Sequence, residues 1–273
     1  MRRERLREAE RKPERGLVPE AGFLEIPTHR ERLATLDSDA LISTMKRALA
    51  EVGVVVVRCK ATQAQFFAVA RRLGIVLTEL AVFVEPRQVP YVRNAGVVPF
   101  HTDHHPLADI IGWYCVQPCR SGTPSVYLDA KDAYDRMSRA DQDKLQRIRL
   151  RVKSAKGQEL VPVVSFDGNR PRFAWNSLWL HKPIEPDAQG AVRRFSTMLA
   201  NRDRAHTVTV PLAAGEFVFI DNKRFLHGRD SIPPDSRRLL YRLWISSDAR
   251  AAQFDLTKPT PMRVLKKRRP PAL

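Results

Sequence analysis

Residues 216–246 read EFVFIDNKRFLHGRDSIPPDSRRLLYRLWIS. The segment opens with an apolar run from Glu216 to Ile220 and closes with a second run, Arg238 to Ser246, that is rich in apolar and aromatic residues. Runs of this length and composition, separated by turn residues such as Asp221-Asn222, are typical of β-strands. The segment therefore predicts two strands of a sheet, with His227 shortly after the first strand and its turn.

Two arginines lie on one face of the second predicted strand. Because alternate strand residues point the same way, Arg238 and Arg242 share a face with Leu240 and Trp244. If that face is exposed, the arginines are ordinary surface charges, but the apolar neighbours argue against exposure. Buried arginines are costly unless each meets an anion. A ligand with two carboxylates would supply both partners through bidentate pairing.

A third pattern, His101-Thr102-Asp103, supplies candidate metal ligands. Residues i and i+2 of a strand face the same side, so His101 and Asp103 would aim a nitrogen and an oxygen at one point. His227 would be the third ligand in a folded-back sheet. Two imidazoles and one carboxylate hold one face of an iron(II) ion and leave three positions open for a 2-oxoacid and O2.

The rest of the chain predicts a mixed α+β fold that is mainly β. Helices are expected at Ser38 to Val52, at Thr62 to Leu73, from Ser138 onward and at Glu185 to Asn201. Further strands are expected at Val54 to Val57, Leu160 to Phe166, Arg172 to Asn176 and Thr207 to Val210. Early helices followed by many short strands favour a β-sandwich or open barrel supported by helices.

Charge divides the chain into a domain and two tails. We expect a mobile basic tail at 1–18, a single domain at 19–250 and a basic tail at 251–273. Of the net charge of +17, residues 1–18 carry +3 and residues 257–273 carry +6, which leaves +8 in the body. A solvated arginine-rich surface explains this excess, and so does attraction to an anionic partner such as an acidic carrier protein or a phosphorylated metabolite. No nucleic-acid recognition motif is present, which argues against that partner.

The sequence favours a cytoplasmic protein. No apolar run has the length of a membrane span, and no apolar signal core follows the charged N-terminus. The three cysteines, an odd number, are expected to be reduced and buried. The oligomeric state is left open.

Four stretches resemble the TauD/TfdA (taurine dioxygenase, clavaminate synthase-like) superfamily of Fe(II)/2-oxoglutarate-dependent oxygenases. They are Phe100-His101-Thr102-Asp103, Ser121-Gly122-Thr123-Pro124-Ser125, Val161 to Val164 with the Asp167-Gly168 turn, and Asp221-Asn222-x4-His227 through Arg238 and Arg242. The resemblance covers roughly residues 40–248 and includes the spacing from His227 to both arginines.

The resemblance implies a double-stranded β-helix (jelly roll) with N-terminal and inserted helices. By position, His101, Asp103 and His227 would hold the iron. Arg242 would bind the distal (C5) carboxylate of 2-oxoglutarate, assisted by Ser125, where the family normally has threonine. Arg238 would lie near the C1 carboxylate or a substrate anion.

The implied reaction is hydroxylation of an unactivated C–H bond of a small molecule, with 2-oxoglutarate converted to succinate and CO2. Halogenating relatives replace the carboxylate ligand with a small residue, so the presence of Asp103 favours hydroxylation. The substrate is expected to be an amino acid or a specialised-metabolite intermediate, free or carrier-bound. The alternatives are a nucleotide or other phosphorylated substrate, desaturation or ring closure, and a catalytically silent jelly-roll binding protein, against which the complete ligand set weighs.

Three further residues are candidate substrate contacts: Glu85, His104 and Asn176. Glu85 precedes the first ligand, where relatives often build a lid, and a carboxylate there would suit the amine of a basic amino acid. His104 directly follows the metal motif, and Asn176 ends a predicted hairpin. A solvated loop acid, an ordinary histidine and a structural asparagine explain the three residues equally well.

Overall fold

A computed structural model describes residues 24–27, 36–84, 95–103, 107–154, 157–200 and 207–248. The predictions for the two tails, for Glu85 and for His104 therefore lie outside the described residues. Within the described part, no helix is long and apolar enough to cross a membrane.

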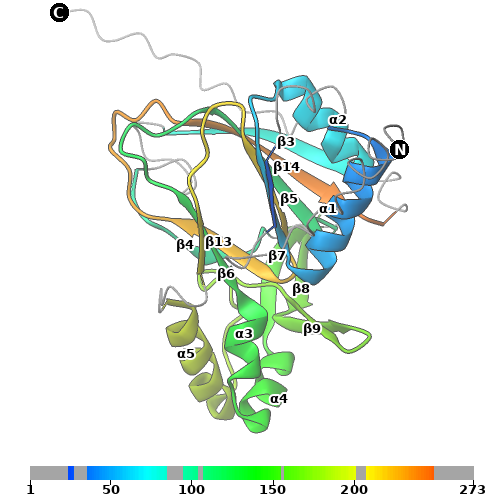
Figure 1. Cartoon of the computed structure of the whole chain (residues 1–273). Helices are drawn as coiled ribbons and strands as arrows, with labels where there is room; N and C mark the ends of the chain where they lie inside the picture. Colours follow the sequence, from blue (N-terminus) through cyan, green and yellow to red (C-terminus); the bar gives the residue numbers. More distant parts are fainter. Residues whose placement is uncertain are drawn as a thin grey trace, which may run out of the picture.

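Two sheets form the framework (Figure 1). The larger sheet has six strands in the order β1 (Leu24–Pro27), β2 (Val54–Arg58), β12 (Phe217–Asp221), β5 (Ile110–Gln117), β14 (Leu239–Ser246) and β3 (Ile75–Phe83). The smaller sheet has four strands in the order β11 (Thr207–Val210), β6 (Ser125–Asp129), β13 (Phe225–Arg229) and β4 (Val98–His101). Neighbouring strands are antiparallel except for the parallel pair β1 and β2.

Strand alternation separates an inner core from two outer cores. Val54 and Val56 belong to the core between the sheets, whereas Val55 and Val57 pack toward the N-terminal helices. All four valines are fully buried, which is why this strand is a continuous apolar run rather than an alternating one. The strand expected at Val54 to Val57 is confirmed.

Helices α1 (Asp39–Glu51) and α2 (Gln63–Leu73) cover the outer face of the larger sheet, as Figure 1 shows. Both lie where the sequence predicts them. Helix α2 begins with a capping box, in which the Thr62 side chain accepts from the Gln65 backbone N–H and the Gln65 side chain accepts from the Thr62 N–H. Phe66 projects from α2 into the outer core and packs on aromatic residues of β5 and β12.

Replacing Phe66 with alanine is expected to lower the free energy of unfolding by about 3–4 kcal/mol. The Phe66 side chain is fully buried, and its ring centroid lies 5.5 Å from Tyr114, 5.4 Å from Phe217 and 5.5 Å from Phe219. Urea unfolding measures the change. Phe166→Ala is the matched control, because that ring is 47% exposed and its loss should cost less than about 1 kcal/mol.

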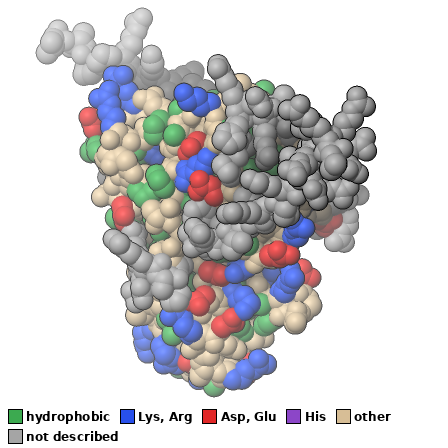
Figure 2. All heavy atoms as spheres, viewed as in Figure 1, with side chains coloured by type: hydrophobic (Ala, Val, Ile, Leu, Met, Phe, Trp, Pro, Cys, Tyr) green, Lys and Arg blue, Asp and Glu red, His purple; other side chains and the backbone are tan. Residues whose placement is uncertain are grey.

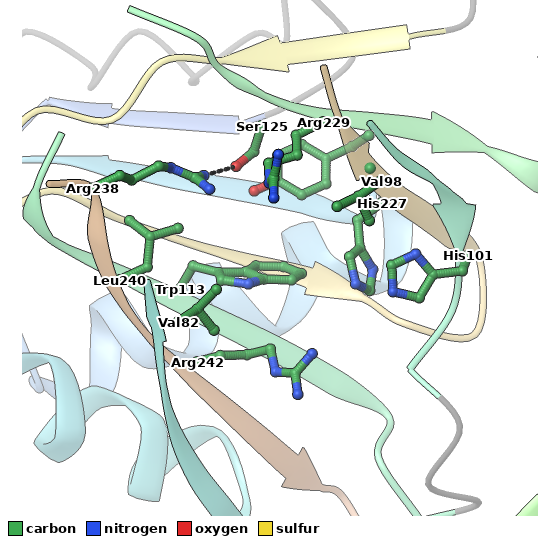
Figure 3. Close-up of a pocket in the computed structure, with 12 residues that line it drawn as sticks. Val82, Val98, His101, Trp113, Ser125, His227, Arg229, Arg238, Leu240 and Arg242 are labelled. Carbon is green, nitrogen blue, oxygen red and sulfur yellow. Dashed lines mark hydrogen bonds between the residues drawn. The ribbon is translucent and has the colours of Figure 1, made fainter. Parts of the chain in front are cut away.

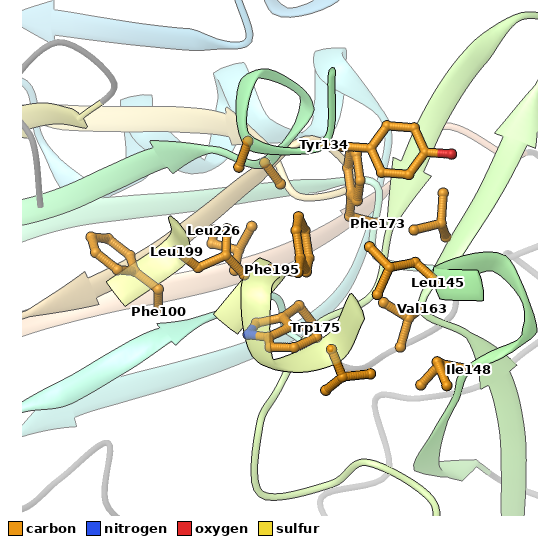
Figure 4. Packing of buried hydrophobic residues seen from close by; sticks show 14 of the residues in the cluster. Phe100, Tyr134, Leu145, Ile148, Val163, Phe173, Trp175, Phe195, Leu199 and Leu226 are labelled. Carbon is orange, nitrogen blue, oxygen red and sulfur yellow. The ribbon is translucent and has the colours of Figure 1, made fainter. Parts of the chain in front are cut away.

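A long insertion between β6 and β11 covers the outer face of the smaller sheet. It consists of α3 (Ala130–Asp135), α4 (Arg139–Arg147), β7 (Arg149–Ser154), β8 (Gly157–Pro162), β9 (Val164–Asp167), β10 (Arg170–Phe173) and α5 (Pro186–Ala200). Its core contains Phe173, Trp175 and Phe195 and includes Phe100 of β4 and Leu226 of β13 (Figure 4). The insertion therefore packs on the smaller sheet through a hydrophobic core that includes residues of both.

The expected strand from Leu160 to Phe166 is in fact two strands in different hairpins. β8 pairs with β7, and β9 pairs with β10. The break falls at Val163, whose N–H donates to the Ile148 carbonyl and whose carbonyl accepts from the Ala174 N–H. Pro162 has no N–H to donate, so it ends the first ladder and the chain changes partners there.

Acidic and basic side chains alternate on the helices of the insertion. Three i,i+4 ion pairs, Lys131–Asp135, Arg136–Asp132 and Arg139–Asp143, lie on or beside α3 and α4. On the face drawn in Figure 2, blue and red side chains are interspersed over this region and form no basic stripe. On this face, the mixture of charges in the described surface agrees with the interpretation of the net charge as a solvated, arginine-rich surface.

Candidate active site

A cavity between the two sheets collects most of the expected site residues (Figure 3). Its lining residues are Val82, Val98, His101, Trp113, Ser125, Tyr127, His227, Gly228, Arg229, Arg238, Leu240 and Arg242. Strands of both sheets contribute, so the cavity exists only when the two sheets are packed together.

The three expected metal ligands meet at one end of this cavity. His101 of β4 and His227 of β13 are register partners, and their ring centroids lie 4.3 Å apart. Asp103 lies two residues beyond the end of β4 rather than on the strand, and its Oδ1 is 3.9 Å from His101 Nε2 and 3.8 Å from His227 Nε2. One ion with bonds of about 2.1 Å can reach atoms this far apart. The donor set and its spacing therefore fit a single metal ion.

Asn222 fixes the backbone that carries Asp103. The fully buried Asn222 side chain accepts from the Asp103 N–H at 3.0 Å and donates to the Asp103 carbonyl at 3.1 Å and to the Ala108 carbonyl at 2.9 Å. On the other side, the Thr102 N–H donates to the Trp175 carbonyl at 2.8 Å, and the Trp175 N–H donates to Thr102 Oγ1 at 2.9 Å. The segment just past β4 is thus clamped although it belongs to no strand.

Replacing Asn222 with alanine is expected to weaken iron(II) binding by about 10- to 100-fold, the usual cost of losing a residue that orients a metal ligand. The change removes all three hydrogen bonds that Asn222 makes to the Asp103 and Ala108 backbone. Anaerobic iron(II) titration measures the dissociation constant. Asn169→Ala, in the exposed β9–β10 turn, is the control, and equal affinity in both variants would contradict the role given to Asn222.

Charged and aromatic donors surround the Asp103 carboxylate. Arg242 Nη1 donates to Oδ1 at 2.9 Å, and Trp244 Nε1 donates to Oδ2 at 2.7 Å. Burial raises the pKa of Asp103, but Arg242 and the two histidines outweigh it and hold the pKa at about 2. Burial, opposed mainly by Asp103, lowers the pKa of His101. At neutral pH the aspartate is therefore ionised and this imidazole neutral, the forms that bind a metal.

The two arginines of the β14 region lie at different ends of the cavity. Arg238, just before β14, donates to Ser125 Oγ at 3.1 Å, whereas Arg242 contacts the Asp103 carboxylate. Four residues of extended chain span about 13 Å, and the two guanidinium groups contact different partners rather than each other. Figure 3 shows Arg238 with Ser125 far from the histidines. The sequence-based assignment paired Ser125 with Arg242, and the geometry pairs Ser125 with Arg238 instead.

The sequence reasoning missed a third buried arginine. Arg229 of β13 is 5% exposed and lines the same cavity. Burial and the nearby positive charge of Arg238 lower the pKa of Arg229 to about 10. The Tyr127 hydroxyl of β6 also faces this region, and burial raises the pKa of that phenol. The signal for Arg229 was its position two residues after His227, which places both on one strand face.

The other expected residues have different outcomes. Asn176 is buried, but it is not among the described residues that line the cavity; its Oδ1 accepts from the Leu178 N–H at 3.0 Å. Glu85 and His104 lie outside the described residues. Cys59, Cys115 and Cys119 are buried and form no disulfide bond with one another, as the sequence predicts.

Comparison with known proteins places the chain in a family. The model of the taurine catabolism dioxygenase TauD, TfdA family matches residues 26–244. No curated protein sequence matches the chain.

Solved structures of similar fold are iron oxygenases. An asparagine oxygenase solved with Fe(II), 2S,3S-3-hydroxyasparagine and succinate has a TM-score of 0.63 at 17% identity, covering 84% of this chain and 95% of that one. The non-heme iron oxygenase OrfP, solved with Fe and alpha-ketoglutaric acid, has a TM-score of 0.65 at 14% identity, covering 85% and 96%. PvcB, an Fe, alpha-ketoglutarate dependent oxygenase from an isonitrile synthetic pathway, has a TM-score of 0.57 at 17% identity, covering 75% and 79%. At these identities the likeness is one of fold. Because the family model spans most of the chain, the chain belongs to the taurine catabolism dioxygenase TauD, TfdA family of iron(II)- and 2-oxoglutarate-dependent oxygenases.

Proposed function

We propose that this oxygenase hydroxylates an unactivated C–H bond of a small molecule, an amino acid or a related biosynthetic intermediate, as 2-oxoglutarate is converted to succinate and CO2. The observation that carries the proposal is the convergence of His101, Asp103 and His227 at one end of a cavity that also holds Arg238 and Arg242. We further infer a double-stranded β-helix, because two sheets that are antiparallel except for the β1–β2 pair enclose the site between them.

The ligand set assigns roles to this chain's own residues. His101, Asp103 and His227 would hold iron(II), which when bound supplies the chemistry of oxygen activation. Retention of the Asp103 carboxylate as the third ligand favours hydroxylation over halogenation. Apolar and aromatic walls, which include Val82, Val98, Trp113 and Leu240, would keep water from the reacting atoms.

The two arginines of the β14 region are given the reverse of the roles expected from the sequence. Arg238 with Ser125 would bind the distal carboxylate of 2-oxoglutarate, because they lie at the end of the cavity away from the metal ligands. Arg242, beside Asp103, would bind the C1 carboxylate or an anionic group of the substrate. Charge-assisted hydrogen bonds of this kind fix orientation as well as binding energy.

Structures of similar fold support an amino-acid substrate. The asparagine oxygenase was solved with 3-hydroxyasparagine, and OrfP was solved with (3R,4R)-dihydroxy-L-Arg. A carboxylate on the substrate would also suit the basic cavity, which three arginines line. A carrier-bound amino acid and a phosphorylated substrate are the competing candidates that the positive charge of the body allows.

Anaerobic addition of Fe(II) and then 2-oxoglutarate tests the proposal. The native protein is expected to develop a visible metal-to-ligand charge-transfer band that His101→Ala lacks. If the native protein shows no band, the proposal is wrong. Substrate class is then tested by succinate release above the uncoupled rate with free amino acids, carrier-bound aminoacyl groups and nucleotides. The class of compound that stimulates succinate release identifies the substrate class.

A further inference from the structure

The strand register of the smaller sheet places functional side chains in two rows. His101 of β4, His227 of β13 and Tyr127 of β6 are register partners across three strands. Arg229 of β13 and Ser125 of β6 are partners one row further along. Paired residues of antiparallel strands point to the same face, so both rows face the cavity. The rows are two residues apart, a separation of about 6.6 Å.

The second row lies where the far end of a metal-bound 2-oxoacid is expected. In 2-oxoglutarate the distal carboxylate is three carbon–carbon bonds from the oxo carbon. A molecule chelating a metal in the first row can therefore extend its distal carboxylate toward the second. Arg238 reaches the same place from the larger sheet, since its Nη2 donates to Ser125 Oγ. Arg229 and Arg238 thus flank Ser125 from opposite sheets, as Figure 3 shows.

We propose that Arg229 is a second positioning arginine that binds the distal carboxylate together with Arg238, and that this pair makes the enzyme selective for a dicarboxylic 2-oxoacid. The inference rests on the proposed function, because it assumes that 2-oxoglutarate binds at the metal. A carboxylate held between two guanidinium groups makes charge-assisted hydrogen bonds to both, which a 2-oxoacid without the distal carboxylate cannot make.

The local backbone directs Arg229 into the cavity. The β13–β4 register shifts between His227 and Arg229, so that Val98 and His101, three residues apart on β4, both line the cavity. Gly228 allows this approach, because a Cβ there would lie 2.7 Å from the Val98 carbonyl oxygen. Arg229 Nη1 donates to the carbonyl oxygens of Gly96 at 2.8 Å and Asp230 at 3.1 Å, which fixes the direction of the guanidinium.

Charge at the cavity wall agrees with an anionic ligand in this row. Among the described lining residues there are three arginines and no aspartate or glutamate. Arg242 pairs with Asp103, just beyond the lining. Arg229 and Arg238 both line the cavity beside Ser125, so two positive charges lie near the position proposed for the distal carboxylate.

Binding of two 2-oxoacids to Arg229→Gln tests the proposal. The iron-loaded protein is titrated anaerobically with 2-oxoglutarate or with 2-oxopentanoate, which has the same length and no distal carboxylate, and the charge-transfer band gives each dissociation constant. We expect Arg229→Gln to weaken 2-oxoglutarate by about 10- to 100-fold and to leave 2-oxopentanoate within about twofold. Arg237→Gln, a change at an exposed arginine beside Arg238, should alter neither constant.

A second measurement does not depend on the folding of Arg229→Gln. Arg238→Gln should still prefer 2-oxoglutarate to 2-oxopentanoate by about tenfold, because Arg229 remains. Unchanged 2-oxoglutarate affinity in Arg229→Gln, equal weakening of both acids, or no preference in Arg238→Gln would each overturn the inference. A native protein without a band would instead overturn the proposed function, so the two failures are distinguishable.

Discussion

Replacing Asp103 with asparagine is expected to lower succinate release by at least about 1000-fold, because the amide would remove the one anionic group of the proposed metal triad. Asparagine keeps the shape of the side chain, so the loss would be chemical rather than steric. Iron binding and succinate release are measured in the same preparations. Activity within tenfold of the native protein would contradict the assignment of Asp103 as a ligand.

The same change is expected to destabilise the metal-free protein by about 3–5 kcal/mol, since Arg242 would lose its buried carboxylate partner. Urea unfolding measures this cost. The double variant Asp103→Asn with Arg242→Met should regain much of the stability and none of the activity. Recovery of stability without activity would separate the structural part of the effect from the catalytic part.

The metal-free native protein should also show the matching pH dependence. The folded-state pKa of Asp103 is about 2, below its ordinary value near 4, so ionised Asp103 stabilises the fold. That stability is fully present above about pH 4 and is lost as the pH falls toward 2. Asp103→Asn should lack this component of acid sensitivity.

Replacing Arg238 with glutamine is expected to raise the KM for 2-oxoglutarate by about 100-fold, with a smaller change in kcat at saturating co-substrate. Arg238 is 8% exposed and its Nη2 contacts Ser125 at the end of the cavity away from the metal ligands, so its loss should weaken binding more than chemistry. Steady-state kinetics with varied 2-oxoglutarate separates the two effects.

Arg237→Gln is the matched control for this prediction, because Arg237 is the exposed neighbour of Arg238. Its KM should stay within about twofold of the native value. If Arg242→Gln raised the KM for 2-oxoglutarate while Arg238→Gln did not, the assignment made from the sequence would be right and the one made from the geometry wrong.

Strand alternation predicted that Arg238 and Arg242 share one buried face, and both line the cavity. The spacing of His101 and Asp103 predicted that their side chains meet, and they do, although Asp103 lies past the end of β4 rather than on it. Which of the two arginines lies beside Asp103 could not be predicted. That depends on where β14 sits relative to the Asp103 segment, which is set by its pairing with β5 and by the packing of two sheets. The spacing of residues along one strand gives information on neither the strand pairing nor the packing of the sheets.

The parts played by Asn222 and Arg229 were not predicted, for a related reason. The roles of both depend on partners far along the chain: Asn222 on the Asp103 backbone, and Arg229 on the register with Ser125. β13 has only five residues and includes Gly228, so its own sequence is a weak strand signal. The role of such a short strand can be recognised only when the positions of its neighbouring strands are known.

The hydrogen bonds between Thr102 and Trp175 have a thermodynamic consequence. They join the residue between two candidate metal ligands to the backbone of Trp175, whose side chain lies in the core of the insertion. A metal ion that binds only when residues 101–103 hold this conformation must, by linkage, also stabilise the packing of the insertion on the sheet. Iron loading is therefore expected to slow hydrogen–deuterium exchange of the Trp175 amide. The exchange rate of this amide in the insertion would then report whether the metal site between the sheets is occupied.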